Sequence, residues 1–111
     1  MSDIDQNKWR YQLATEKNYI ILDVRTTEEF EQIRLPNSTN IDFYNPPNFI
    51  QELEKLDKNK SYYVYCKTGN RSAAACDLMK EMGFSKTYNL LGGISEYFKE
   101  LRVKINKEDA I

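Results

Sequence analysis

The sequence predicts an α/β domain with a mainly parallel central sheet flanked by helices. Short runs of β-branched and aromatic residues alternate with segments whose apolar residues recur at helical spacing, along nearly the whole chain. No internal repeat or linker interrupts this alternation, and 111 residues is the length of one ordinary domain. We therefore expect a single domain over residues 1–105 and a frayed tail over residues 106–111.

The first half of the chain is expected to supply two helices and two strands. Asp5 can cap the first helix, and Thr26 or Thr27 can cap the second. The run Tyr19-Ile20-Ile21-Leu22, which ends at Asp23, is typical of a strand buried on both faces. In chain order we expect a helix around 9–14, a strand at 19–22, a helix at 28–33 and a strand at 38–43.

The second half is expected to supply three helices and two strands. After a break at 45–48, apolar residues recur at spacings of three and four and give the next helix one apolar face, formed by Phe49, Ile50, Leu53 and Leu56. Gly83 is placed to end the following helix. In chain order we then expect a strand at 61–66, a helix at 71–82, a strand at 87–91 and a last helix whose face carries Ile94, Tyr97, Phe98 and Leu101.

Composition excludes several classes of partner. Sixteen basic residues are offset by seventeen acidic ones and form no dense basic run, so nucleic acid is not an expected partner. The longest apolar runs fall far short of the roughly 20 residues that span a bilayer, so no membrane is expected. The first residues are polar and acidic, with no apolar signal segment after them, and this predicts a cytoplasmic protein. In that reducing compartment Cys66 and Cys76 are expected to be free thiols.

The absence of histidine is the most informative feature of the composition. It excludes a serine or cysteine nucleophile activated by imidazole, and any nucleophile must be activated in another way. Two cysteines cannot complete a tetrahedral thiolate zinc site within one chain. We therefore expect no metal and no cofactor.

Cys66 stands where a predicted strand gives way to a loop that can stabilise a thiolate. The six-residue loop Cys66–Arg71 leads into a helix that we expect to begin near Ser72. Loop amides can form an anion-binding nest, and the helix N-terminus adds partial positive charge. Gly69 permits a positive φ, while Lys67 and Arg71 add cationic character. The alternative is that Cys66 is a small buried hydrophobe at a strand end.

Ligands of parallel sheets bind at the carboxyl ends of the strands, and three segments of this chain are expected to meet there. These segments are Asp23–Arg25, Cys66–Ser72 and Gly92–Gly93. Asp23 and Arg25 could equally form a strand-end ion pair or a helix cap, and the glycine pair could simply be a turn. Cys76 lies beside the apolar face of its helix, which favours a packed core thiol over a resolving cysteine.

Three motifs, in order, resemble those of the single-domain rhodaneses, which are sulfurtransferases with a cysteine-centred six-residue loop. Leu22-Asp23-Val24-Arg25 with Glu29-Phe30 resembles the first motif of that family. Tyr65-Cys66-Lys67-Thr68-Gly69-Asn70-Arg71-Ser72 resembles its active-site loop, and Leu91-Gly92-Gly93-Ile94 resembles its closing glycine motif. The likeness covers most of the chain, and it is specific because the three motifs occur together at suitable spacing.

The resemblance implies a three-layer rhodanese-like fold and a sulfurtransferase activity. A sulfane sulfur would pass from a small anionic donor such as thiosulfate to a thiol, a protein acceptor or cyanide, through a persulfide on Cys66. Asp23 and Arg25 would support the site. The substrate and the transferred sulfur would be cradled by the loop residues Lys67, Thr68, Gly69, Asn70, Arg71 and Ser72.

The chain also departs from the family pattern. Where the family commonly has Gly-His-Ile-Pro-Gly-Ala, the segment Ile33-Arg34-Leu35-Pro36-Asn37-Ser38 keeps only the proline, and Tyr97 stands where a tryptophan often follows the glycines. These changes bear on the surface around the crevice mouth, where Arg34 could alter the choice of donor or partner. Two other functions remain open: a persulfide carrier or protein-interaction module of the same fold, and a cysteine phosphatase or arsenate reductase. Cysteine phosphatases and arsenate reductases also place a cysteine and an arginine in one loop. Their loops have five residues between the cysteine and the arginine, whereas this loop has four.

Overall fold

A computed structural model describes residues 3–99, which form a five-stranded sheet flanked by helices. Every neighbouring pair of strands is parallel, so the sheet is entirely parallel rather than mainly so. The strand order is β1-β5-β4-β2-β3, with β4 at the centre. The strands are β1 (Asp3–Ile4), β2 (Tyr19–Asp23), β3 (Ser38–Asn40), β4 (Ser61–Tyr65) and β5 (Lys86–Leu90).

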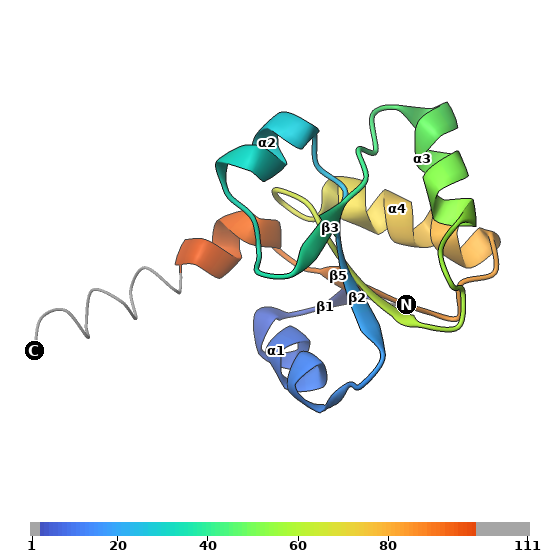
Figure 1. The fold of residues 1–111 in the computed structure, drawn as a ribbon. Coiled ribbons are helices and arrows are strands. Elements are labelled where there is room, and N and C mark those ends of the chain that lie inside the picture. Colours follow the sequence, from blue (N-terminus) through green and yellow to red (C-terminus); the bar gives the residue numbers. More distant parts are fainter. Residues whose placement is uncertain (1–2, 100–111) are drawn as a thin grey trace, which may run out of the picture.

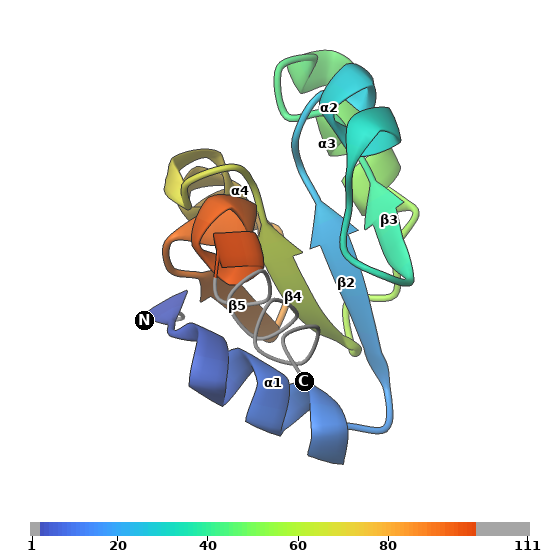
Figure 2. The same ribbon diagram turned by 90° about the vertical axis from the view of Figure 1, so that its left-hand side faces the viewer.

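Helices cover both faces of the sheet, as the predicted fold class requires (Figure 1). The helix α1 and a helix over residues 93–99 pack on one face, and α3 and α4 pack on the other. Figure 2 shows α2 beyond the arrowheads of β2 and β3, at the carboxyl end of the sheet. The bounds are α1 (Gln6–Thr15), α2 (Thr27–Gln32), α3 (Pro46–Glu54) and α4 (Asn70–Glu81).

The central strand β4 is buried along its whole length and divides the core into two clusters. Because side chains alternate along a strand, Tyr63 and Tyr65 join the cluster under α1, where Trp9 packs edge-on against both rings. Tyr62 and Val64 join the opposite cluster, under α3 and α4. Cys66 continues this alternation, and its side chain therefore lies on the α4 side of the sheet.

Local signals set the ends of several helices where the sequence predicts them. Asp5 caps α1 by accepting a hydrogen bond from the Lys8 amide at 2.8 Å. Of the two candidate threonines Thr26 caps α2, in a reciprocal capping box with Glu29. Gly83 follows the end of α4 with a φ of 99°, as expected for a glycine that terminates a helix.

Some expectations were wrong in detail. The strand β1 was not anticipated, because two residues carry no periodicity and form a strand only by pairing with β5. The strand expected at 38–43 is only three residues long, and β2 is fully buried only in its second half. Ile50, which was expected on the apolar face of α3, is 38% exposed. The helix α4 begins at Asn70, within one residue of the expected helix at 71–82, and its first turn includes the end of the cysteine loop.

Two further expectations concern the ends of the chain and the membrane. Leu101 on the last helix and the tail at 106–111 lie outside the described residues. Over residues 3–99, no helix has the length and apolar character needed to cross a bilayer.

Candidate active site

The three segments expected to share a crevice meet at the carboxyl end of the sheet, which confirms that prediction. The Val24 amide donates to the Tyr65 carbonyl at 3.1 Å and ties the end of β2 to the end of β4. The amides of Ile94 and Ser95 donate to the carbonyls of Cys66 and Lys67 at 2.9 and 3.1 Å. The start of the 93–99 helix is therefore hydrogen-bonded directly to the cysteine loop.

Gly93 is needed for this close approach and is more than a turn residue. It has a φ of 61°, and a Cβ at this position would lie 2.4 Å from the Lys67 carbonyl oxygen and 2.6 Å from that of Cys66. Both atoms belong to backbone, so no side-chain movement could relieve the overlap. The glycine pair therefore allows the last helix to support the loop.

The Cys66 sulfur lies at the centre of the loop and accepts several hydrogen bonds. The Gly69 amide donates to Sγ at 3.1 Å, and the amide and hydroxyl of Ser72 lie 3.4 and 3.3 Å away. Gly69, with a φ of 103°, turns the chain into α4, and this turn brings amides from the loop and the first helical turn toward one point. The loop is therefore an anion-binding nest built around one sulfur atom.

These hydrogen bonds lower the pKa of the Cys66 thiol below its ordinary value. Burial raises the pKa, because the side chain is only 1% exposed. Hydrogen bonds from the Ser72 hydroxyl and from the amides of Ser72, Gly69 and Thr68 lower it by more. The site can thus hold a thiolate in a chain that contains no histidine.

Arg71 is held beside the loop by Glu29 of α2. Its two terminal nitrogens, Nη1 and Nη2, donate to Oε1 and Oε2 of Glu29 at 2.7 and 3.0 Å, and its guanidinium lies 5.2 Å from the centre of the Tyr44 ring. Hydrogen bonds from Arg71 lower the pKa of Glu29 to about 2, although partial burial opposes this shift. A direct contact of Arg71 with substrate remains a prediction, since its fork faces a carboxylate in this structure.

Asp23 and Arg25 form a buried ion pair at the end of β2. Arg25 Nη2 lies 2.7 Å from Asp23 Oδ2, and the Arg25 amide donates to Oδ1 of the same carboxylate at 2.8 Å. Arg25 Nη2 also donates to the Ile33 carbonyl at 2.6 Å. This is the strand-end ion pair that the sequence left open, and it fixes the segment after α2 against β2.

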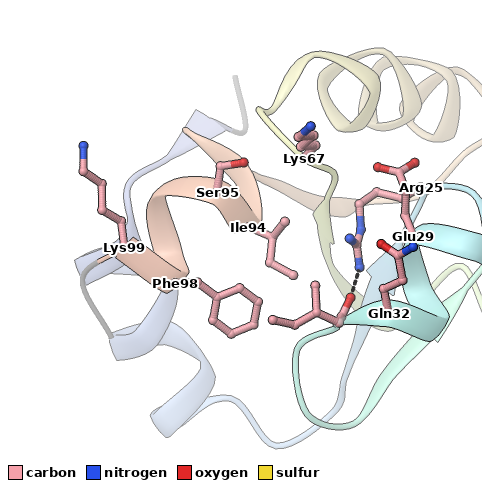
Figure 3. Close-up of a pocket in the computed structure, with 9 residues that line it drawn as sticks. Arg25, Glu29, Gln32, Lys67, Ile94, Ser95, Phe98 and Lys99 are labelled. Atoms are coloured by element: carbon pink, nitrogen blue, oxygen red, sulfur yellow. Dashed lines mark hydrogen bonds between the residues drawn. The ribbon is translucent and has the colours of Figure 1, made fainter. Parts of the chain in front are cut away.

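A hollow of about 600 Å³ lies beside the loop, between α2 and the 93–99 helix (Figure 3). Figure 3 shows Ile94, Ser95 and Phe98 on one side of it, Arg25, Glu29 and Gln32 on the other, and Lys67 between the two groups. Lys67 lines this hollow, whereas Cys66 is absent from the described lining residues. The hollow is lined by apolar side chains of the 93–99 helix together with Lys67 of the loop. Its described lining consists of Arg25, Glu29, Gln32, Ile33, Lys67, Ile94, Ser95, Phe98 and Lys99.

The remaining predicted residues divide into two groups. Lys67, Thr68 and Asn70 are exposed on the outside of the loop, whereas Gly69 and Ser72 are buried beneath it. Cys76 is 2% exposed and belongs to the apolar cluster under α4, as predicted for a core thiol.

Two residues near the site were not identified from the sequence as functional. Glu29 belongs to the first motif quoted above, but no role was assigned to it, because its contact with Arg71 links positions 42 apart. Asn89 is a buried polar residue of β5 whose amide nitrogen donates to Asp3 at 3.0 Å and to the Gly69 carbonyl at 3.3 Å. Its only signal was a polar side chain next to an apolar strand end.

Comparison with known proteins gives a consistent result. Residues 6–100 match the family described as Rhodanese-like domain. The chain is 36% identical over 102 residues to "Adenylyltransferase and sulfurtransferase UBA4" of Debaryomyces hansenii, covering 80% of this chain and 21% of that protein. It is 28% identical over 94 residues to "Sulfurtransferase" of Allochromatium vinosum, covering 85% of each. The chain therefore spans about a fifth of the first relative and most of the second.

A solved structure gives the same result for the fold. A rhodanese-like domain protein from Staphylococcus aureus is 31% identical to this chain and superposes with a TM-score of 0.72. The match covers 85% of this chain and 88% of that one. The similarity thus extends over nearly the whole of both chains.

Proposed function

This chain belongs to the rhodanese-like domain family, and on that premise we propose that it is a sulfurtransferase that carries a sulfane sulfur as a persulfide on Cys66. The observation that carries the proposal is the hydrogen-bonded Cys66 sulfur, which accepts from Gly69 and Ser72 at the end of the central strand. Relatives over most of this chain are named for the same class of reaction.

The proposed cycle has two displacement steps. The Cys66 thiolate attacks the outer sulfur of a donor such as thiosulfate, a new sulfur–sulfur bond forms, and the bond to the leaving sulfite breaks with its electron pair. The negative charge then resides on the outer sulfur of the Cys66 persulfide. An acceptor thiolate or cyanide attacks that outer sulfur, and Cys66 leaves again as the thiolate. No proton needs to be removed from Cys66 during turnover, which suits a site without histidine.

The loop would stabilise the charged species on both sides of each step. Amides that point to one centre stabilise a thiolate and a nearby persulfide anion much as an oxyanion hole stabilises an alkoxide. Lys67 at the edge of the hollow adds positive charge where an anionic donor would enter. We propose that the donor and then the acceptor approach the loop in turn from the side that carries Lys67.

Intact-mass spectrometry tests the proposal directly. The purified chain is treated briefly with thiosulfate and then with cyanide, and the Cys66→Ser and Cys76→Ala variants are treated in parallel. We expect one added sulfur on the wild type and on Cys76→Ala, removed by cyanide, and none on Cys66→Ser. An adduct that persists in folded Cys66→Ser, or an absence of adduct on the wild type with every donor tried, would contradict the assignment to Cys66.

A persulfide carrier that exchanges sulfur only with partner proteins is the second candidate. It is favoured by the first relative above, in which the matching segment is about a fifth of a longer protein. Transfer from a protein persulfide but not from thiosulfate would identify the carrier. Turnover with free donors and acceptors would identify the enzyme.

Phosphoryl chemistry is less well supported by the geometry. Only four residues separate Cys66 from Arg71, and the guanidinium of Arg71 is bound to Glu29 rather than directed over the loop. Hydrolysis of p-nitrophenyl phosphate that depends on Cys66 would overturn this preference.

A further inference from the structure

A chain of hydrogen bonds leads from the Cys66 sulfur to β1 at the edge of the sheet. The Ser72 hydroxyl lies 3.3 Å from Sγ, and it also hydrogen-bonds Oδ1 of Asn89 on β5. Asn89 in turn donates to Asp3 Oδ1 at 3.0 Å and to the Gly69 carbonyl at 3.3 Å. Ser72 and Asn89 are both buried, so water does not compete freely for these contacts.

The Ser72 hydroxyl has one hydrogen and two acceptors within reach. The acceptors are the Cys66 sulfur and the Asn89 carbonyl oxygen, and a hydroxyl can donate to only one at a time. The orientation of the Asn89 amide is fixed, because its nitrogen is directed to two oxygens, one on Asp3 and one on Gly69. Asn89 therefore presents an acceptor to Ser72 and cannot present a donor without losing both contacts.

The charge on the sulfur decides which acceptor receives the hydrogen. A hydrogen bond to an ionised acceptor is about twice as strong as one between neutral groups. A thiolate at Cys66 would therefore draw the hydroxyl hydrogen away from Asn89. A neutral sulfur is a weak acceptor, and the hydrogen would then return to the amide oxygen.

We propose that Asn89 is a positioning residue for Cys66: it offers the Ser72 hydroxyl a second acceptor, so that the hydroxyl turns between the two as the charge on the sulfur changes. If the proposed function holds, the rotation also occurs within the catalytic cycle. When the persulfide forms, the negative charge moves to the outer sulfur. The inner sulfur is then a weak acceptor, and the Ser72 hydroxyl turns back to Asn89. No proton leaves the hydroxyl in either state, so the rotation needs no acid or base.

Charged groups on the surrounding elements also act on Cys66 and must be held constant in a test. Arg71 of α4 favours the thiolate, and Lys67 is the next residue of the loop. The Asp23–Arg25 pair lies at the end of the adjacent strand β2, and Asp3 lies at the far end of the hydrogen-bond chain. Substitutions at Ser72 and Asn89 leave all of these charges in place.

The test is a double-substitution cycle on the pKa of the Cys66 thiol. All chains carry Cys76→Ala, which leaves Cys66 as the only cysteine. The four chains combine Ser72 or Ser72→Ala with Asn89 or Asn89→Leu, and the rate of iodoacetamide alkylation is followed against pH. Ser72→Ala removes one donor to the sulfur and should raise the pKa by about one pH unit.

Asn89→Leu separates the proposal from a purely structural role. With Ser72 present, removal of the competing acceptor should lower the pKa of Cys66 by up to about one pH unit, because the Ser72 hydroxyl then has no amide acceptor in the neutral thiol state. With Ser72→Ala, Asn89→Leu should have no effect. The loop should persist in both cases, because the Gly69 carbonyl also accepts from the Ala73 amide at 3.1 Å.

The opposite results overturn the proposal. An upward shift, an equal shift in both backgrounds or no shift at all would mean that Asn89 does not act through the Ser72 hydroxyl. Asn89→Ala repeats the test with a smaller side chain if Asn89→Leu does not fold. The alkylation needs no sulfur donor, so a positive result here with no persulfide in the mass experiment would contradict the proposed function alone.

Discussion

The two cysteines of this chain lie in the same apolar cluster, but Cys66 begins a loop and Cys76 lies inside a helix. Cys66 is 1% exposed and Cys76 is 2% exposed, so contact with solvent does not distinguish them. Cys66 directly follows β4, and amides from the loop and the first turn of α4 point to its sulfur. Cys76 lies inside α4, where the backbone amides serve the hydrogen bonds of the helix itself. The direction of neighbouring amides, rather than depth, makes a buried cysteine suited to act as a thiolate.

The largest expected effect comes from removing each sulfur in turn. Cys66→Ser should lower the rate of sulfur transfer from thiosulfate to cyanide by at least about a thousandfold, because it removes the nucleophile. Cys76→Ala should leave that rate nearly unchanged, because the side chain packs in the core away from the loop amides. Steady-state kinetics on both folded variants measures the contrast. A large loss in Cys76→Ala would instead favour the alternative role of Cys76 as a resolving cysteine.

A second pair of variants tests whether the close packing of the last helix against the Cys66 loop is important for stability. Gly93→Ala should destabilise the fold by about 3 kcal/mol or more, because its Cβ would overlap the carbonyls of Cys66 and Lys67. Gly83→Ala is the matched control, since it also has a positive φ but meets only a lysine side-chain carbon at 3.8 Å. It should cost about 1 kcal/mol.

Urea unfolding of these two glycine variants gives the comparison. Equal losses of stability at Gly93 and Gly83 would mean that the close approach of the last helix does not constrain the loop. A larger loss of stability at Gly93, together with slower alkylation of Cys66 at neutral pH, would show that the 93–99 helix helps to keep the Cys66 thiol ionised.

The fold could be predicted from sequence because its signals are local. The alternation of strands and helices, the Asp5 and Thr26 caps and the glycine after α4 each depend on a few adjacent residues. The strand β1 could not be predicted, because its two residues become a strand only through pairing with Asn89 and Leu90. The shortness of β3 and the exposure of Ile50 likewise depend on packing between elements distant in the chain.

The site divides in the same way. Cys66, its loop and the meeting of three strand ends followed from the order of elements, since the carboxyl ends of parallel strands share one edge. The pairing of Arg71 with Glu29 and of Ser72 with Asn89 did not follow, because each joins residues many positions apart. The general arrangement of a site on a parallel sheet can be inferred from motifs, whereas its hydrogen-bond partners require three-dimensional structure.

A third prediction concerns the cation beside Cys66. Glu29 has a pKa of about 2 in the fold against an ordinary value of 4.5, because Arg71 and, to a smaller extent, Thr26 hydrogen-bond its carboxylate. These contacts together stabilise the folded state by up to about 3 kcal/mol at pH 7. Because the folded pKa is depressed, this contribution is complete above pH 4.5 and is lost as the pH falls toward 2. Unfolding free energies of the wild type and Glu29→Gln should therefore differ at neutral pH and converge in acid.

Glu29→Gln is a sharp test because glutamine can still complete the capping box with Thr26. The loss of stability then reports on the Arg71 contact and not on the helix cap. Glu52→Gln on α3 is the matched control, since the exposed pair of Glu52 with Lys55 should contribute almost nothing. A difference between wild type and Glu29→Gln that stays constant from pH 7 to pH 2 would contradict the lowered pKa.

The smallest expected difference between Cys66 and Cys76 is in the pH dependence of their alkylation in the native protein. The pKa of Cys66 lies below its ordinary value, so in the Cys76→Ala chain its alkylation should reach half its maximal rate at a lower pH than alkylation of a free cysteine. In the Cys66→Ser chain, no loop amides are directed at Cys76, so it should react far more slowly in the folded protein, and a denaturant should accelerate it strongly. Peptide mapping assigns each modified sulfur. If Cys76 in the folded protein reacted with the same pH profile as Cys66, the amides directed at Cys66 would not be the cause of its reactivity. The apolar cluster that both cysteines share would then have to account for the reactivity of both thiols.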